Sequence, residues 1–212
     1  MATRVFAALY PPQAVLDEAA ALMDQVRFET GLGLRWMPVE QWHITLAFYG
    51  NTPAGALERI DEELSRIGNH YAPFELRLAG AGHFGHRTLW LGVSGDERHS
   101  LTKIAAEARE AGELAGLDLG EERAFSPHLT VARRSVRGRF RDRQAERGYR
   151  RQLRQARRYG TEAAVMPPVL GSDDIAAAVH ALSVFRGTSF TAESLALMES
   201  TLGDGPGGGA LH

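Results

Sequence analysis

The sequence of 212 residues predicts an α+β fold with two related lobes, each an antiparallel sheet with helices outside, and a cleft between them. Three observations favour this fold. Segments with helical and with strand periodicity alternate along the chain. The strands are short and bounded by turns, which suits an α+β architecture as well as a parallel one. Finally, a helix, a break and a similar four-residue motif follow one another in each half, so the two halves are expected to be pseudo-symmetric.

The individual elements follow from local patterns. Apolar residues at intervals of three and four predict helices over 13–27, 53–67 and 97–115. Alternating or short apolar runs bounded by Gly, Pro or Asn predict the strands. The expected strands span residues 4–9, 43–49, 74–78, 88–93, 126–133, 180–185 and 194–201.

The chain is long enough, and apolar enough at 44%, to bury one substantial core. We expect a single bilobal domain over 1–202, with an arginine-rich connection over 138–171. Six of the ten residues in 203–212 are glycine or proline, which predicts a disordered tail. No N-terminal signal pattern and no run of about 18 apolar residues is found, so a cytoplasmic protein without a membrane partner is expected, as a monomer.

Charge and cysteine content exclude some functions and indicate others. The chain has no cysteine, which excludes disulfides, thiolate metal sites and cysteine nucleophiles. The net charge is −2, but residues 133–158 contain twelve arginines against Asp142 and Glu146, a local charge of +10. That asymmetry indicates a polyanion partner. A solvated helix from an arginine-rich proteome is the alternative, since Lys103 is the sole lysine.

Two segments carry the same motif, a histidine, an aliphatic residue, a threonine and another aliphatic residue. They are His43-Ile44-Thr45-Leu46 and His128-Leu129-Thr130-Val131. In a strand, residues i and i+2 project from one face. Each segment therefore presents an imidazole beside a hydroxyl on one face and an apolar pair toward the core.

Paired histidines and threonines suit acid–base chemistry on a phosphodiester. One imidazole can take a proton from the nucleophile while the other protonates the leaving oxygen, because histidine adopts either protonation state near neutrality. The threonine hydroxyls can donate hydrogen bonds to the non-bridging oxygens. The scheme requires no metal or other cofactor. Structural edge-strand histidines with hydrogen-bonded threonines are the alternative.

The residues around these motifs resemble the 2H phosphoesterases, in particular the bacterial RNA 2′,3′-cyclic phosphodiesterases also described as 2′-5′ RNA ligases (LigT-like). The resemblance extends over about residues 4–186. It lies in Arg4-Val5-Phe6-Ala7-Ala8-Leu9, Trp36-Met37-Pro38, Trp42-His43-Ile44-Thr45-Leu46-Ala47-Phe48-Tyr49-Gly50, Thr88-Leu89-Trp90-Leu91-Gly92-Val93, Phe125-Ser126-Pro127-His128-Leu129-Thr130-Val131-Ala132-Arg133 and Leu182-Ser183-Val184-Phe185-Arg186.

The resemblance implies a bilobal fold with a V-shaped cleft and a hydrolase that opens terminal 2′,3′-cyclic phosphates of RNA to 2′-phosphomonoesters. It implies that His43 protonates the leaving ribose oxygen and that His128 activates water. Thr45 and Thr130 would hold the phosphate. Reversible 2′-5′ ligation also follows from the family.

Two further substrate-binding residues are expected. Arg133 follows His128 by five residues, where the family often carries an arginine, and it could contact phosphate in a bidentate manner. Phe48 occupies the equivalent place after His43 and could stack on a base. The alternatives are core packing for Phe48 and the start of the basic run for Arg133.

The sequence departs from the family pattern in two places. Residues 138–171 look longer and richer in arginine than the usual connection, and residues 189–202 lack a tyrosine-containing final strand. Two other functions stay open: a 2H phosphoesterase acting on small cyclic nucleotides or 2′-5′ linkages, and a non-catalytic module that binds RNA ends. A metal pair at His83 and His86 is disfavoured by a glycine-rich turn without nearby carboxylates.

Overall fold

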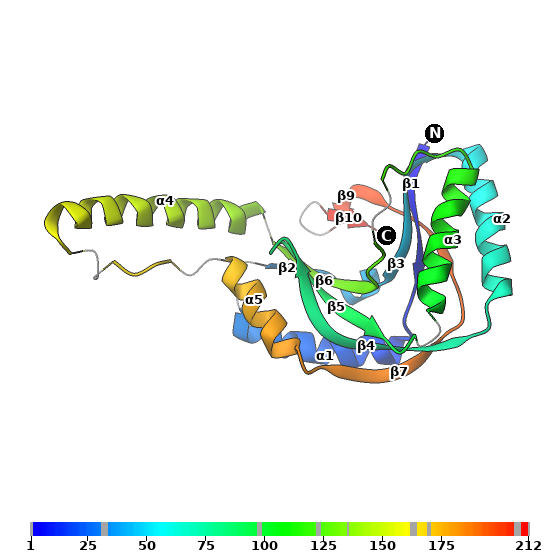
Figure 1. The fold of residues 1–212 in the computed structure, drawn as a ribbon, viewed down its shortest axis with the longest axis horizontal. Helices are drawn as coiled ribbons and strands as arrows, with labels where there is room; N and C mark the ends of the chain where they lie inside the picture. Colours follow the sequence, from blue (N-terminus) through cyan, green and yellow to red (C-terminus); the bar gives the residue numbers. More distant parts are fainter. Residues whose placement is uncertain are drawn as a thin grey trace.

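The computed structural model describes residues 2–30, 34–96, 99–121, 124–134, 136–161, 165–168, 171–205 and 209–211. Its described residues form a strongly curled antiparallel sheet with helices packed along its outer side (Figure 1). The α+β class predicted from the sequence is confirmed.

Eight strands form the main sheet, in the order β7-β4-β5-β6-β3-β1-β8, and β2 pairs with β6 beside this path. Every pairing between these strands is antiparallel. The strands are β1 (Ala2–Leu9), β2 (Leu34–Trp36), β3 (Ile44–Pro53), β4 (Phe74–Phe84), β5 (Thr88–Ser94), β6 (His128–Arg134), β7 (Arg186–Ala192) and β8 (Ala196–Glu199).

The helices divide the sheet into two halves. Helices α2 (Ala54–His70) and α3 (Ser100–Leu114) cover β1, β3 and β8, whereas α1 (Gln13–Thr30) and α5 (Gly171–Leu182) pack along β4, β5 and β7. Helix α1 follows β1 in the chain but packs in the other half, and α3 follows β5 but packs on β3. Each half thus receives a helix from the other, which makes their folding interdependent.

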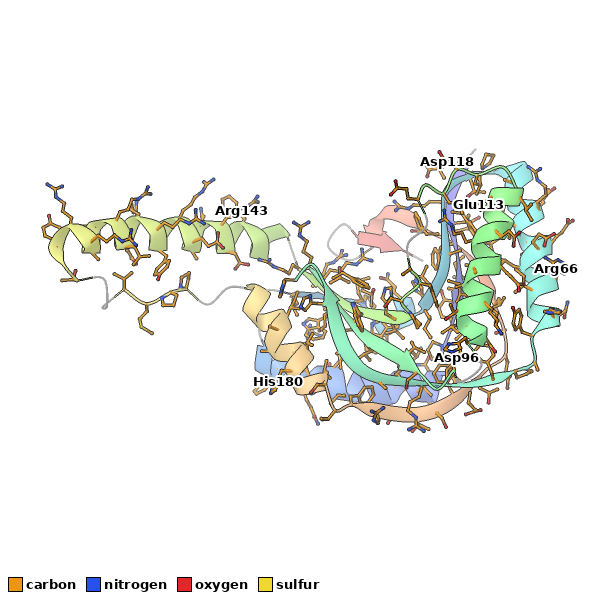
Figure 2. All side chains as sticks on the ribbon, viewed as in Figure 1. Arg66, Asp96, Glu113, Asp118, Arg143 and His180 are labelled. Atoms are coloured by element: carbon orange, nitrogen blue, oxygen red, sulfur yellow. The ribbon has the colours of Figure 1, made fainter. Side chains whose placement is uncertain are left out.

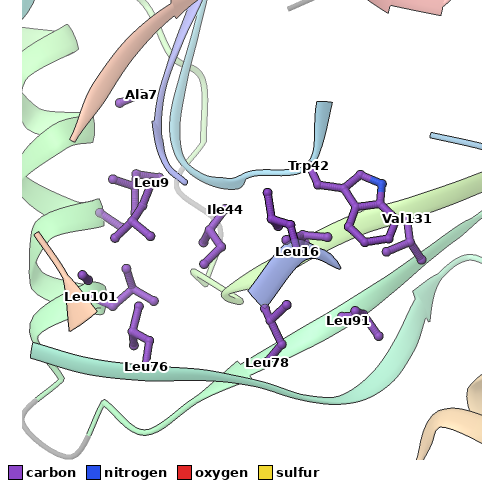
Figure 3. Close-up of a cluster of buried hydrophobic side chains, with 14 of the residues drawn as sticks. Ala7, Leu9, Leu16, Trp42, Ile44, Leu76, Leu78, Leu91, Leu101 and Val131 are labelled. Atoms are coloured by element: carbon purple, nitrogen blue, oxygen red, sulfur yellow. The ribbon is translucent and has the colours of Figure 1, made fainter. Parts of the chain in front are cut away.

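The core lies between the sheet and these helices. The aliphatic residues of both motifs are buried, as the period-two pattern predicts: Ile44, Leu129 and Val131 are 0% exposed. They pack with leucines of β4 and β5 and with Leu16 and Leu101 of the helices (Figure 3). The side chains at positions 43, 45, 128 and 130 therefore lie on the opposite face of the strands, outside the core.

The three helices expected from periodicity are present with small shifts at their ends. Helix α3 begins at Ser100 rather than at residue 97, because the Asp96 carboxylate accepts hydrogen bonds from the N–H groups of Ser100 and Leu101 at 2.7 and 2.8 Å. That carboxylate satisfies two of the donors at the helix start.

The strand expected over 180–185 is wrong. These residues lie at the end of α5 and in the turn after it, and the strand of this region is β7. Ile175, Ala178 and Leu182 are buried at helical spacing, so a helix with small residues satisfies this packing better than a strand. The arginine-rich connection over 138–171 consists largely of a helix, α4 (Val136–Tyr159), which projects from the body (Figure 1).

The C-terminal residues also differ from expectation. Within 203–212, predicted to be a disordered tail, the described residues pair as β9 (Thr201–Gly205) and β10 (Gly209–Leu211). Backbone hydrogen bonds between strands need no side chain, so glycine content alone does not exclude such a hairpin. In the described part of the chain, no helix has the length and hydropathy to cross a lipid bilayer.

Candidate active site

The two motif strands lie next to each other in the sheet. Strands β3 and β6 are antiparallel, and Ile44 is paired with Leu129, the equivalent residue of the other motif. An antiparallel pair that meets at equivalent residues is related by a local two-fold axis. Beyond this pair the two strands have other partners, and the motif residues His43, Thr45, His128 and Thr130 lie directly on either side of it in the chain.

These four side chains line one cavity of about 160 Å³. Phe48 and Arg133, the other two residues expected to bind substrate, line it as well. All six residues selected from the sequence are therefore brought together, although 85 positions separate the two histidines. The remaining lining residues are Phe6, Met37 and Gln41.

Both histidines are held by the backbone in the same way. Nδ1 of His43 lies 2.8 Å from the carbonyl oxygen of Gln41, and Nδ1 of His128 lies 2.7 Å from that of Ser126. A carbonyl oxygen can only accept, so each Nδ1 carries the proton of its hydrogen bond. In each histidine Nε2 is the other ring nitrogen, which accepts a hydrogen bond when the ring is neutral and donates one when it is charged.

Aromatic rings surround the two imidazoles unequally. His43 is stacked on Phe6, with ring centroids 4.7 Å apart and planes at 27°, and Tyr10 lies at 5.8 Å. His128 meets Phe84 edge-on, with centroids 4.8 Å apart and planes at 85°. The face of an aromatic ring attracts a cation. The two imidazoles therefore differ in their aromatic surroundings.

These aromatic neighbours were not identified as site residues from the sequence. Trp90 also lies beside His128, at 6.0 Å between centroids, and contacts Phe84. Phe6 comes from β1, Phe84 from β4 and Trp90 from β5, so only strand pairing brings them to the histidines. No spacing along the chain connects these residues with the motifs.

Arg133, which lines the cavity, has a second arginine beside it. Arg133 of β6 is paired in register with Arg35 of β2. Partial burial, followed by the neighbouring Arg35 cation, lowers the pKa of Arg133 below its usual range. Arg35 was not anticipated from the sequence as a neighbour of Arg133.

Phe48 lies between the catalytic cavity and a larger pocket. Its side chain is 47% exposed, and the guanidinium carbon of Arg4 lies 4.7 Å from the ring centroid. The second pocket, of about 690 Å³, is formed by β3, α3 and the segment that precedes β6. It is lined by Leu46, Ala47, Phe48, Thr102, Ala106, Arg109, Leu119, Gly120, Glu121 and Phe125.

The His83 and His86 rings lie close together, with centroids 3.9 Å apart, at the turn between β4 and β5. The backbone N–H of His86 donates to Nδ1 of His83 at 3.3 Å. No cluster of three or more side chains able to ligate a metal ion is found among the described residues.

Comparisons with known proteins agree with the fold. The model of the 2′-5′ RNA ligase superfamily matches residues 12–166, which include both motifs. The chain is 31% identical over 151 residues to a Methanothermobacter thermautotrophicus protein named RNA 2′,3′-cyclic phosphodiesterase, covering 69% of this chain and 78% of that one. It is 39% identical over 103 residues to a protein of the same name from Geobacillus stearothermophilus, covering 47% of this chain but only 32% of the relative.

Solved structures show the same architecture. A protein from Thermus thermophilus superposes with a TM-score of 0.64 at 24% identity, covering 98% of this chain and 92% of the other. Apo LigT of E. coli gives a TM-score of 0.58 at 21% identity, covering 97% and 91%. These identities support the fold alone. With a family model matching well over half of its length, including both motifs, the chain belongs to the 2′-5′ RNA ligase superfamily.

Proposed function

We propose that this chain is a metal-independent RNA 2′,3′-cyclic phosphodiesterase that opens terminal cyclic phosphates to 2′-phosphomonoesters. One observation carries the proposal. Two histidines, each fixed through Nδ1 to a backbone carbonyl, share a cavity of about 160 Å³ with two threonines. The name borne by the relatives supports the same substrate class.

The proposed reaction is a single displacement at phosphorus. Nε2 of His128 takes a proton from water as the water oxygen forms its bond to phosphorus. The bond from phosphorus to the ribose 3′-oxygen breaks, and Nε2 of His43 gives its proton to that oxygen. The phosphate stays on the 2′-oxygen. His43 ends neutral and His128 charged, so a proton exchange with solvent restores the starting state.

The other cavity residues act on the phosphate and the base. The Thr45 and Thr130 hydroxyls donate to the non-bridging oxygens, where negative charge concentrates in the transition state. Arg133, at the rim, contributes positive charge, and Phe48 offers an aromatic face to the terminal base. With the 5′-hydroxyl of another RNA in place of water, the same residues would catalyse 2′-5′ ligation.

The deciding experiment is hydrolysis, in EDTA, of an RNA oligonucleotide that ends in a 2′,3′-cyclic phosphate. We expect turnover by the wild type and loss of at least about 10³-fold in His43→Ala and in His128→Ala, because each removes a proton-transfer group. His180→Ala, at an exposed histidine of α5, is the matched control and should retain activity. Phosphorus NMR of the product should locate the phosphate on the 2′-oxygen.

Each alternative function has its own outcome. Turnover only of small cyclic nucleotides or of 2′-5′ linkages would keep the mechanism and change the substrate. RNA binding without turnover of any of these substrates would indicate an end-binding module. Turnover that EDTA abolishes would contradict the metal-free scheme.

The pH profile tests the division of roles between the histidines. Since one imidazole must be neutral and the other charged, kcat/KM should be bell-shaped in pH. The measurement is the rate on the cyclic-phosphate oligonucleotide from about pH 5 to 9. A rate that stays constant over this range would contradict the two-histidine mechanism.

A further inference from the structure

Helix α4 carries seven of its ten arginines on one face. Arg143, Arg147, Arg150, Arg154 and Arg158 follow at intervals of three and four residues, which places them along one stripe of a helix. Arg151 and Arg157 flank that stripe. At ~100° per residue, these seven side chains fall within an arc of about 120°. If these arginines only reflected an arginine-rich proteome, there would be no reason for them to gather on one side of the helix.

The arginine face is the exposed face of α4. All seven of these side chains are exposed. The opposite side carries Ala145, Tyr149, Leu153 and Ala156, which are partly or fully buried, and α4 contacts α5. In Figure 2, Arg143 lies on the side of α4 away from the chain that returns toward α5. The apolar side thus lies opposite the arginine face and is at least partly buried.

The helix is attached directly to the strand that carries the second histidine. Strand β6 ends at Arg134, one residue beyond Arg133 at the cavity rim, and α4 begins at Val136. Arg134 and Asp142 form an ion pair whose side chains are each 15% exposed. This pair fixes the first turns of α4 to β6. A chain lying along α4 would thus approach the catalytic cavity.

The positive charge of the arginine face exceeds the negative charge of the acidic residues in α4. Asp142 and Glu146 are the two acidic residues of the helix, and Asp142 is paired with Arg134. In the other helices, arginines lie three or four residues from an acidic residue, as in Arg66–Glu63 and Arg109–Glu113. Like charges at this spacing disfavour the isolated helix. A bound polyanion would relieve that repulsion.

We propose that the arginine face of α4 binds the phosphate backbone of the RNA upstream of the terminal cyclic phosphate. The 24-residue helix is about 36 Å long, far longer than the terminal nucleotide in the cavity, so its ligand is an extended chain of phosphates. Arginine suits such a ligand because its guanidinium pairs with phosphate oxygens in a bidentate manner. The substrate is therefore a long RNA, held at its end by the cavity and along its backbone by α4. This inference rests on the proposed function.

The test compares two variants of the full chain with equal loss of charge. The first is Arg147→Gln/Arg150→Gln/Arg154→Gln, in which glutamine preserves helix propensity. The control is Arg27→Gln/Arg66→Gln/Arg186→Gln, at exposed positions on α1, α2 and the start of β7. Fluorescence anisotropy measures Kd for a 24-nucleotide RNA with an ordinary 3′-hydroxyl at several salt concentrations. Rates are measured on a 24-nucleotide and on a dinucleotide 2′,3′-cyclic phosphate.

We expect the α4 variant to bind the long RNA at least about 10-fold more weakly at low salt, with a salt slope smaller by about 2 for three lost phosphate contacts. Its kcat/KM should fall on the 24-nucleotide substrate and stay within about twofold of wild type on the dinucleotide. The control variant should match wild type in each measurement. Circular dichroism should show unchanged helix content in both variants.

Several results would overturn the inference. These are an unchanged RNA affinity and salt slope in the α4 variant, an equal loss in the control variant, or α4-dependent binding to phosphatidylserine vesicles but not to RNA. The RNA used to measure binding is not a substrate, so the binding result does not depend on catalysis. Each of the two proposals can therefore be contradicted without the other. A wild type that hydrolyses neither substrate contradicts the proposed function, while its anisotropy still decides the role of α4.

Discussion

At the scale of single residues, the backbone orients the two motif histidines. Each Nδ1 lies within 2.8 Å of the carbonyl oxygen two residues earlier in the chain. A contact this local depends on the residues directly before each motif, Gln41 and Ser126, and not on the rest of the fold. The two imidazoles are thereby presented identically, and their different aromatic neighbours distinguish them.

The threonines provide a prediction at this scale. Thr45→Val or Thr130→Val removes one hydroxyl donor while keeping the shape of the strand. Each should lower kcat on the cyclic-phosphate oligonucleotide by about 10²-fold, as loss of one donor to a developing anion does in other enzymes. Thr52→Val, on the same strand β3 but away from the cavity, is the control. Equal effects at all three positions would indicate a structural role for the threonines.

Phe48 provides a second prediction. Phe48→Ala should raise KM for RNA ends about 10-fold, because stacking of a base on an aromatic ring contributes ~1–3 kcal/mol. Phe48→Trp should restore KM toward the wild-type value, and Phe28→Ala, at a 93% exposed residue of α1, should leave it unchanged. Steady-state kinetics on the oligonucleotide decide this. A KM unaffected by Phe48→Ala would remove Phe48 from the binding site.

At the scale of elements, helix α3 packs so closely on β3 that one position requires glycine. A Cβ at Gly112 would lie 2.7 Å from the Tyr49 ring and 3.0 Å from Leu119. Tyr49 is 4% exposed, and its hydroxyl donates to the carbonyl oxygen of Ala108 at 2.7 Å, so the ring has little freedom to move. This packing sets the distance between α3 and the strand that carries the first motif.

The prediction concerns two glycine substitutions in helices. Gly112→Ala should destabilise the protein by ~1–3 kcal/mol through overpacking, although alanine is the better helix former. Gly68→Ala in α2, where a Cβ would meet nothing within 4 Å, should instead be neutral or stabilise by up to ~1 kcal/mol. Urea denaturation of both variants provides the comparison. Equal stabilities would show that β3 and α3 adjust to the extra methyl group.

At the scale of the whole molecule, the two halves are joined through a narrow contact. Strands β3 and β6 share the single register pair Ile44 and Leu129, and beyond this pair each strand continues with other partners. The cavity lies where the strands diverge. The exchange of α1 and α3 between the halves holds this junction together.

Alkaline stability is a prediction for the whole molecule. Burial raises the pKa of Tyr49 well above its ordinary value of about 10, so the folded protein retains a proton that the unfolded chain releases. The corresponding stability is present below about pH 10 and is lost above it, at about 1.4 kcal/mol per pH unit. Tyr49→Phe should therefore make the fall in Tm above pH 10 shallower.

The measurement is Tm by circular dichroism from about pH 8 to 11, where the two curves should converge as pH rises. At neutral pH, Tyr49→Phe should be less stable by about 1 kcal/mol because it lacks the hydrogen bond to Ala108. Tyr159→Phe, at an exposed tyrosine of α4, serves as the control. A parallel decline in wild type and Tyr49→Phe would contradict the prediction.

Much of the protein was determined by sequence alone. The α+β class, helices α1 to α3 and the strands that carry the motifs follow from local periodicity, because side-chain burial repeats every two or 3.6 residues. The six proposed site residues could be selected because a repeated pattern is visible without a structure. The prediction of a strand over 180–185 was wrong, because a short apolar run with small residues fits a helix as well as a strand. The end of α5 lies there instead, and the strand β7 begins after it.

Only the tertiary structure decided what surrounds the histidines. The pairing of Ile44 with Leu129, the aromatic rings from β1, β4 and β5, and Arg35 beside Arg133 all depend on contacts between distant segments. Likewise, the sequence shows that 133–158 is basic, but only the helix places seven of its arginines along one exposed face. Local sequence determines periodicity, whereas strand order and register are set by burying the whole core at once.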